Sequence, residues 1–478
     1  MPKIQLTDSN GAVRHGMHIG SVERPHSIMA EDRARYLKYA PWKRVAALAV
    51  ALVPMVSCLL VPKPLVITAP PAVEASRPDA TDTPQAAVRW YNTFWQALAA
   101  INLKAAWILA DSKEQRKLAD AIDDFLQGKN EEAASTVVPL LAAQDSVVRN
   151  AARITYGAIL TAEGNWSRLA AYADSASRET PDAAGVETWA PAFKGVSTTV
   201  AFADSASAVP LGRSATGVAV IPVMVNGVTR HFWLDTGSSI TILTSEVADA
   251  SKVVGIGGDT LQLVTAVGRL PTRAAVVKSL KLGGVIVTNA RAMIVNAAAL
   301  QMREVASGMP PEPIDGVIGF DLIRSLDLTI NDITGRVIIR KPSFRTADVN
   351  RPRNLMWYGV PIVNLLSENG SEVHLVLDTG AQETFGTPGM ARKTNAHWRA
   401  AERRTVRGFG GSESESGIVM PSVRLFLGDV PLTFRRVFLY EALYPTIFTL
   451  DGTLGSDIGR GGVVRIDMTN GRLDVSGK

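Results

Sequence analysis

The alternation of hydrophobic and polar positions divides this chain into stretches of different character. The first is Val45–Val61, a run of 17 residues without a charged side chain. A membrane-spanning helix needs about 20 apolar residues, so this run is at the short end of that range. We predict a transmembrane anchor over residues 45–62. A cleaved signal peptide, or a lipoprotein attached at Cys58, is the alternative interpretation of the same run.

The residues on either side of this run predict its orientation. The 44 residues before it hold eight Lys and Arg against four Asp and Glu. Positively charged flanks stay in the cytoplasm, so residues 1–44 are expected to form a cytoplasmic tail. Residues 63–84, rich in Pro, Ala and Thr, are predicted to be a linker. This layout favours a single-pass protein of a bacterial inner membrane, with its C-terminal domains in the periplasm.

Residues 85–195 carry a helical pattern. Leu118, Ile122 and Phe125 recur at the spacing of one helix face. A helix–glycine–helix pattern occurs twice, and its glycines, Gly128 and Gly164, are 36 residues apart. That spacing is near the tetratricopeptide period of about 34 residues. We predict an all-α domain, either tetratricopeptide-like or a simple helical bundle, as a candidate surface for a protein partner.

From about residue 198 the pattern changes to short β-branched runs between turn residues. Asn226-Gly227, between two apolar runs, is a strong hairpin signal. This sequence pattern is also duplicated. Residues 218–340 resemble residues 359–475 in their apolar runs and in their hairpin-like endings. Two β-rich lobes are therefore predicted, at 198–345 and 355–478. The whole chain is expected to be multidomain α+β.

Composition excludes several classes of function. The net charge is +5, and the Lys and Arg residues form no basic stripe, so nucleic-acid binding is not expected. Cys58 is the single cysteine, which rules out an intrachain disulfide and a cysteine-rich zinc site. The six histidines form no cluster with metal-ligand spacing. We expect neither a metal nor an organic cofactor.

The strongest chemical signal is Asp-Thr-Gly, which occurs twice, each time at the end of an apolar run. The first copy is Asp235-Thr236-Gly237, and the second is Asp378-Thr379-Gly380. Each is followed by a further shared element: "DGVIGFDLI" begins 80 residues after the first Asp, and "DGTLGSDI" begins 73 residues after the second. Two similar lobes are therefore expected to bring two carboxylates face to face.

The residue types of this tripeptide suit acid–base work on water. Asp235 and Asp378, held close together, cannot both ionise, so the pair would share one proton. One carboxylate would then take a proton from water while the other donates one to a carbonyl oxygen. The glycines, Gly237 and Gly380, permit a tight turn. The threonines, Thr236 and Thr379, are expected to hydrogen-bond into the opposite lobe.

These motifs resemble the retropepsin- and pepsin-like aspartic proteases, and bacterial retropepsin-like domains most of all. The resemblance covers about residues 200–478 and implies a bilobal all-β acid-protease fold. It also implies that a hydrophobic–hydrophobic–Gly element supports each catalytic loop, here with Ile318, Gly319, Leu454 and Gly455. Thr453, which precedes Leu454, is polar where the family is usually apolar.

The resemblance further implies glycine-rich flaps over the substrate. In the second lobe the candidate flap is Gly408, Phe409, Gly410 and Gly411, within "GFGGSES". In the first lobe the best candidate is "VTAVGRL", residues 264–270.

Together these observations predict a membrane-anchored aspartic endopeptidase that cleaves peptide or protein substrates. The alternative is a catalytically silent, protease-like protein that binds peptides and assembles partners through its helical domain. Both Asp-Thr-Gly copies are intact, which favours the enzyme. The sequence leaves open whether the two lobes pair within one chain or between chains.

Overall fold

The computed structural model describes residues 91–176, 189–265, 268–300, 314–346, 351–396, 399–408, 411–440, 444 and 446–477. The chain divides into two units, Met1–Lys63 and Pro64–Lys478, and all of these residues belong to the second. The predicted tail, anchor and linker, residues 1–84, lie outside the described residues. Within the described part, no helix has both the length and the apolar character needed to cross a membrane.

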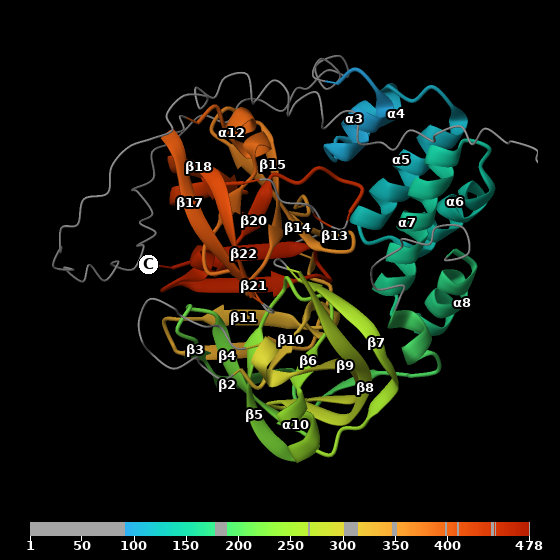
Figure 1. Cartoon of the computed structure of the whole chain (residues 1–478). Coiled ribbons are helices and arrows are strands. Elements are labelled where there is room, and N and C mark those ends of the chain that lie inside the picture. Colours follow the sequence, from blue (N-terminus) through green and yellow to red (C-terminus); the bar gives the residue numbers. More distant parts are fainter. Residues whose placement is uncertain are drawn as a thin grey trace, which may run out of the picture. The chain divides into compact units, whose positions relative to one another are not determined.

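The first described elements are helices (Figure 1). Leu118, Ile122 and Phe125 are buried on one face of the helix that the periodicity predicts. Gly128 and Gly164 follow two of the helices with φ of 81° and 66°, a left-handed backbone that glycine adopts without steric cost. The two predicted helix–glycine–helix units are confirmed, whereas tetratricopeptide-like packing stays a prediction.

Side-chain caps fix where the two longest of these helices begin. The Ser112 hydroxyl accepts a hydrogen bond from the Gln115 amide, and the Asp145 carboxylate accepts one from the Val147 amide. We call the following elements, together with Trp189, the helical region: α3 (Phe94–Ala99), α4 (Leu103–Ile108), α5 (Lys113–Leu126), α6 (Asn130–Val137), η1 (Val138–Ala142), α7 (Ser146–Ala162), α8 (Trp166–Ala176) and η2 (Ala190–Phe193).

The first lobe is a sheet of nine strands in the described part of the chain, in the order β1-β9-β6-β10-β5-β4-β8-β7, with β3 beside β4. The predicted hairpin at Asn226-Gly227 is confirmed, because it joins two antiparallel strands and both residues have positive φ. The elements of this lobe are β1 (Thr199–Phe202), β3 (Gly212–Arg213), β4 (Ala219–Val225), β5 (Val228–Leu234), β6 (Ile242–Thr244), α10 (Ser245–Ala250), β7 (Gly255–Thr265), β8 (Gly268–Leu282), β9 (Val285–Val295), η3 (Ala297–Ala299), β10 (Gly316–Ile318) and α11 (Phe320–Ile323).

The second lobe repeats this arrangement with eight strands among the described residues. In each lobe the short strand that precedes Gly319 or Gly455 lies parallel to the strand that leads to Asp-Thr-Gly. The elements are β13 (Leu355–Trp357), β14 (Pro361–Ser367), β15 (Glu372–Leu377), β16 (Phe385–Gly386), α12 (Pro388–Thr394), β17 (Arg399–Gly408), β18 (Gly411–Leu427), β19 (Val430–Leu439), β20 (Gly452–Leu454) and η5 (Ser456–Gly459).

A third sheet joins the two lobes. Its order is β2 (Ala206–Pro210), β12 (Arg336–Arg340), β11 (Asp327–Asn331), β21 (Val463–Asp467) and β22 (Arg472–Ser476). The hairpin-like endings of the two sequence repeats therefore pair with each other, through β11 and β21. Across that pair the Arg465 guanidinium donates a hydrogen bond of 2.6 Å to the Asp327 carboxylate. This mostly β region is consistent with a bilobal protease fold whose lobes pair within one chain.

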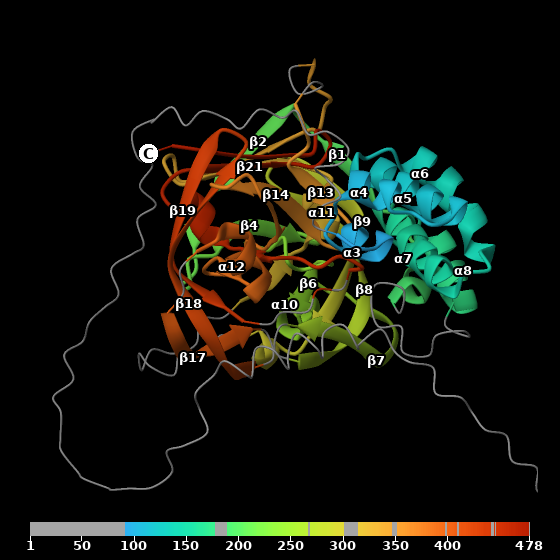
Figure 2. The same cartoon turned by 90° about the horizontal axis from the view of Figure 1, so that it is seen from above.

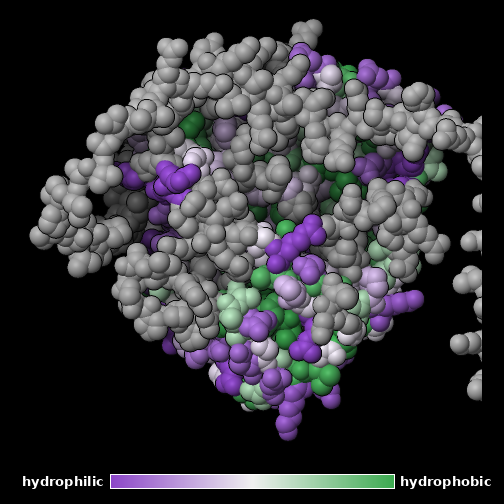
Figure 3. All heavy atoms as spheres, in the orientation of Figure 1, coloured by the Kyte–Doolittle hydropathy of each residue, from purple (hydrophilic) through white to green (hydrophobic). Residues whose placement is uncertain are grey.

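The long hairpins β7–β8 and β17–β18 extend toward the same side of the molecule, at the lower edge of Figure 2. On the face shown in Figure 3, the coloured surface of the first lobe intersperses hydrophilic and hydrophobic residues rather than gathering the hydrophobic ones into one patch. The apolar positions predicted from the strand pattern instead fill the interior. In β4, for example, the alternate residues Ala219, Ile221, Val223 and Val225 are buried.

Candidate active site

Each Asp-Thr-Gly segment begins directly after a strand. β5 ends one residue before Asp235, and β15 ends one residue before Asp378. The Asp235 amide donates to the Ile318 carbonyl at 3.1 Å, and the Asp378 amide donates to the Leu454 carbonyl at 3.0 Å. The structure therefore brings each predicted supporting element against its own Asp-Thr-Gly loop.

The two threonines connect the loops across the lobes. The Thr236 hydroxyl donates to the Leu377 carbonyl at 2.7 Å and accepts from the Thr379 amide at 3.0 Å. The Thr379 hydroxyl donates to the Leu234 carbonyl at 2.8 Å and accepts from the Thr236 amide at 3.0 Å. Both threonines are buried. The predicted bracing contact across the lobes is present, in a reciprocal form.

Backbone amides of the same loops orient the two carboxylates. The Asp235 Oδ1 accepts from the amides of Gly237 and Ser238, at 2.8 and 3.2 Å. The Asp378 Oδ1 accepts from the amides at Gly380 and Ala381, at 2.9 and 3.0 Å. Equivalent oxygens are thus fixed in the same way in both loops.

The glycines of the two loops leave room for the facing carboxyl groups. A Cβ at Gly237 would lie 2.5 Å from the Asp378 Cγ, and a Cβ at Gly380 would lie 2.5 Å from the Asp235 Cγ. Real Cβ atoms do not approach that closely, so any larger residue would push a carboxyl group away. The close approach of the two loops, not only the turn itself, requires glycine here.

The environment of the carboxylates favours a shared proton. Burial is the largest cause that raises the pKa of Asp235 well above its usual value, and the neighbouring Asp378 raises it further. Burial also raises the pKa of Asp378, while its hydrogen bond to Asp235 opposes that rise. Since one carboxyl hydrogen-bonds to the other, the pair retains one proton at a pH where isolated aspartates would both be ionised.

Both supporting glycines lie in tight spaces. A Cβ at Gly319 would lie 2.5 Å from the Ile240 carbonyl carbon, and one at Gly455 would lie 2.6 Å from the Glu383 carbonyl carbon. The polar exception, Thr453, is buried and shares a hydrogen bond of 2.9 Å with the Tyr444 hydroxyl. That partner accounts for a polar side chain at an otherwise apolar position.

A second pair of aspartates, Asp321 and Asp457, was not predicted from the sequence. The Thr241 hydroxyl donates to Asp321 at 3.0 Å and accepts from the Gly319 amide at 3.3 Å. In the second lobe, the Thr384 hydroxyl donates to Asp457 at 2.7 Å and likewise accepts from the supporting glycine amide. The signal was present, because both repeats place an Asp two residues after the supporting glycine.

Asp315 and Asp451, which open the two downstream elements, bond to strand backbone rather than to the Asp235 and Asp378 loops. Asp315 accepts from the His231 amide at 2.8 Å, and Asp451 accepts from the His374 amide at 2.9 Å. The two histidines differ in environment: His231 is exposed, whereas burial lowers the pKa of His374 to about 3. His374 is therefore neutral at physiological pH.

Both candidate flaps fall at hairpin tips. In the first lobe Thr265 pairs with Gly268 at the end of β7–β8. In the second, Gly408 pairs with Gly411 at the end of β17–β18, and Phe409 and Gly410 lie outside the described residues. Their action as flaps stays a prediction.

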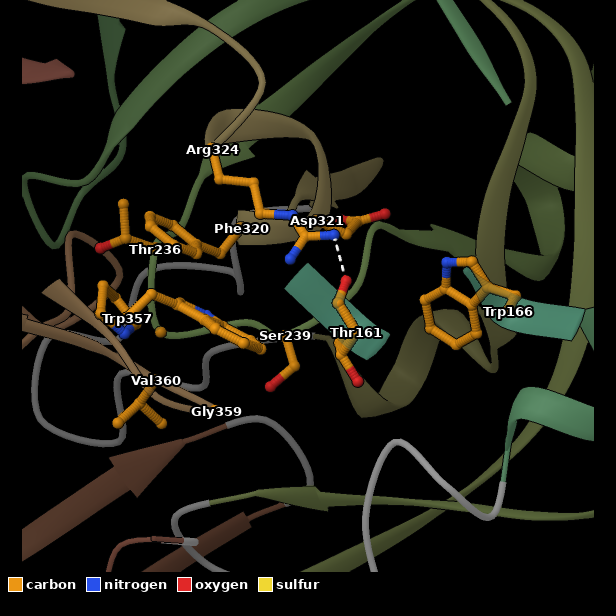
Figure 4. Close-up of a pocket in the computed structure, with 12 residues that line it drawn as sticks. Thr161, Trp166, Thr236, Ser239, Phe320, Asp321, Arg324, Trp357, Gly359 and Val360 are labelled. Atoms are coloured by element: carbon orange, nitrogen blue, oxygen red, sulfur yellow. Dashed lines mark hydrogen bonds between the residues drawn. The ribbon is translucent and has the colours of Figure 1, made fainter. Parts of the chain in front are cut away.

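A pocket lies beside the Asp235 loop (Figure 4). Thr236, Gly237 and Ser239 contribute to its wall, together with residues of α11, of the segment after β13, and of the helical region. Arg324 donates a hydrogen bond of 2.6 Å to the Thr161 carbonyl of α7, drawn as the dashed line in Figure 4. Burial raises the pKa of nearby Asp321 to about 6, and the charges of Arg291 and Arg324 oppose that rise.

No three His, Cys, Asp or Glu side chains gather as metal ligands within the described residues.

The comparisons with known proteins find a family match within the first lobe. Residues 221–322 match the aspartyl protease family, and this segment contains Asp235 and Gly319. Among solved structures, a retropepsin-like aspartic protease from Rickettsia conorii matches with 20% identity and a TM-score of 0.20, over 30% of this chain and 94% of that one. No curated protein matches the chain. The family resemblance inferred from the sequence is confirmed, and the tetratricopeptide resemblance of the helices stays a prediction.

Proposed function

We propose that this chain is an aspartic endopeptidase in which Asp235 and Asp378 act as one catalytic dyad. The observation that carries this proposal is the reciprocal approach of the two loops, in which each carboxyl group lies over the glycine of the other loop. Two threonine hydroxyls fasten that approach across the lobes. A turn aspartate with no chemical role would need neither feature.

In the proposed mechanism, the dyad with its single proton holds a water molecule between the two carboxyl groups. The ionised carboxyl takes a proton from the water as the water oxygen bonds to the peptide carbonyl carbon. The protonated carboxyl donates its proton to the carbonyl oxygen, which gives a tetrahedral diol. Proton transfer to the nitrogen then lets the C–N bond break, which yields a carboxylic acid and an amine. The acid and base roles belong to the pair and alternate between its members.

The substrate in this proposal is an extended peptide. It would lie between the lobes, under the hairpins β7–β8 and β17–β18, whose tips include the candidate flap residues Gly408 and Gly411. The rise in the pKa of both aspartates favours activity under weakly acidic conditions, because the dyad must keep one proton.

The cellular setting of the proposal rests on the sequence. The uncharged run within residues 45–62 and the basic residues before it favour a single inner-membrane anchor, with the protease in the periplasm. Proteolysis in that setting would act on exported or membrane-attached proteins.

The test is cleavage of a peptide library by the purified unit Pro64–Lys478 between pH 3 and 8. Asp235→Asn and Asp378→Asn are the informative variants, and Asp249→Asn, at an exposed position of α10, is the matched control. We expect cleavage by the wild type and the control and at least a thousandfold loss in each dyad variant. A folded wild type that cleaves nothing, or a dyad variant that retains activity, would refute the proposal.

A further inference from the structure

The helical region contacts the β7–β8 hairpin of the first lobe directly. Trp189, which immediately precedes η2, donates its indole N–H to the Gln262 carbonyl of β7 at 3.1 Å. Trp189 is 6% exposed, whereas Gln262 is exposed, so this bond lies at the edge of the buried contact. A buried indole N–H without that acceptor would be left unsatisfied, which makes the contact specific as well as apolar.

The two faces of this hairpin have different surroundings. Leu263 and Leu270, which are paired across it, are 6% and 8% exposed and belong to the same buried cluster as Trp189 and Phe193. Val264, the next residue along β7, is 63% exposed. Successive strand residues point to opposite faces. One face of the hairpin is therefore buried with the helical region, and the other is open.

A second contact reaches the strand behind the hairpin. The guanidinium of Arg291, in β9, stacks over the Trp166 ring of α8 with 4.7 Å between the guanidinium carbon and the ring centre. Trp166 in turn packs edge-on against Phe193, with ring centres 5.5 Å apart. Because β9 pairs with β8, the helical region holds the first lobe at the hairpin and at its neighbouring strand.

We infer that Trp189 is a positioning residue of the protease site, through which the helical region holds β7–β8 as a fixed wall of the substrate cleft. The inference rests on the proposed function for the identity of the cleft. It assigns the helical region a part in substrate binding by the protease itself, rather than only in partner assembly. Trp189 acts through the hairpin and does not touch the reacting atoms.

The experiment uses the full chain and two readouts. Trp189→Phe keeps an aromatic ring and removes the N–H donor, and Leu263→Ala removes the buried apolar contact. Leu366→Ala, at a 42% exposed position of the second lobe, is the control. Amide hydrogen exchange is followed over the hairpin, residues 255–282, and KM and kcat are measured with one cleaved peptide.

We expect Trp189→Phe and Leu263→Ala to speed exchange near the tip of β7–β8 at least tenfold and to raise KM at least fivefold. The kcat is expected to stay within twofold of the wild type, because the dyad is untouched, and the control should change neither readout. Unchanged hairpin exchange in Trp189→Phe would overturn the inference, as would faster exchange with an unchanged KM. A wild type that cleaves nothing would instead refute the proposed function, and the positioning role with it, while exchange would still report whether Trp189 holds the hairpin.

Discussion

Replacing Thr236 with valine tests the lock between the two lobes. The two side chains have nearly the same shape, so the change removes the hydroxyl and little else. In the wild type that hydroxyl donates to the Leu377 carbonyl and accepts from the Thr379 amide. The position is 1% exposed, so no water can replace the lost partner without a rearrangement of the loops.

The size of the effect follows from these two contacts. Each buried backbone group that loses its partner costs about 1–3 kcal/mol. Two such groups give an expected loss of about 2–6 kcal/mol in the free energy of unfolding, with a similar loss in Thr379→Val. A domain is typically stable by about 5–15 kcal/mol, so either change should be plainly visible. The double variant should lose less than the sum of the two, because the four bonds belong to one network.

The assay is urea unfolding of Pro64–Lys478, followed by far-ultraviolet circular dichroism and by tryptophan fluorescence. Coincident transitions would justify a single free energy of unfolding. Thr394→Val is the control, because the Thr394 hydroxyl bonds only to carbonyls of its own helix, α12, and its loss should cost within about 0.5 kcal/mol. If Thr236→Val loses no more stability than this control, the threonine lock does not hold the lobes together.

The remaining predictions concern charge, space and the helical contact. Asp235→Asn should raise the melting temperature at pH 7 by about 2 °C or more. Burial raises the pKa of Asp235 in the folded state, so the wild-type carboxyl stabilises the fold below its unfolded pKa and destabilises it above its folded pKa. The gain in melting temperature from Asn should therefore vanish near pH 3. A gain that grows toward pH 3 would contradict this. Gly237→Ala should lower kcat about a hundredfold by displacing Asp378. In the control, Gly255→Ala, the added Cβ meets nothing closer than 3.6 Å, so kcat should change little. Equal losses of kcat in the two variants would refute the packing argument. Arg324→Met should lower the free energy of unfolding by about 0.5–1.5 kcal/mol in urea, because the Thr161 carbonyl loses one of its two donors and keeps the Gly164 amide. An unchanged midpoint would mean that this contact contributes nothing.

The sequence by itself determined the local features of this protein. Periodic apolar positions predicted the buried face of α5, and Asn226-Gly227 predicted a hairpin, because such features depend on neighbours a few residues apart. The duplication of a whole frame around Asp235 and Asp378 pointed to two paired lobes, since each copy alone would lack half of an acid–base pair. Gly237 and Gly380 were predicted from the sequence as turn residues, whereas their close approach to the facing carboxyl groups is seen only in the structure.

Only the tertiary structure decided which distant groups meet. Thr236 and Thr379 are 143 residues apart in the sequence. No local sequence pattern predicts that the hydroxyl of each hydrogen-bonds to backbone groups of the opposite lobe. Asp321 and Asp457 occur at equivalent positions of the two repeats. Their role became clear only in the structure, where the Thr241 hydroxyl donates a hydrogen bond to Asp321. The pairing of β11 with β21, and the hold of Trp189 on β7, likewise depend on the packing of separately folded segments. Sequence periodicity fixes which face of a helix or strand is apolar. Which element covers that face depends on the shape of both elements and on the polar groups that each must pair.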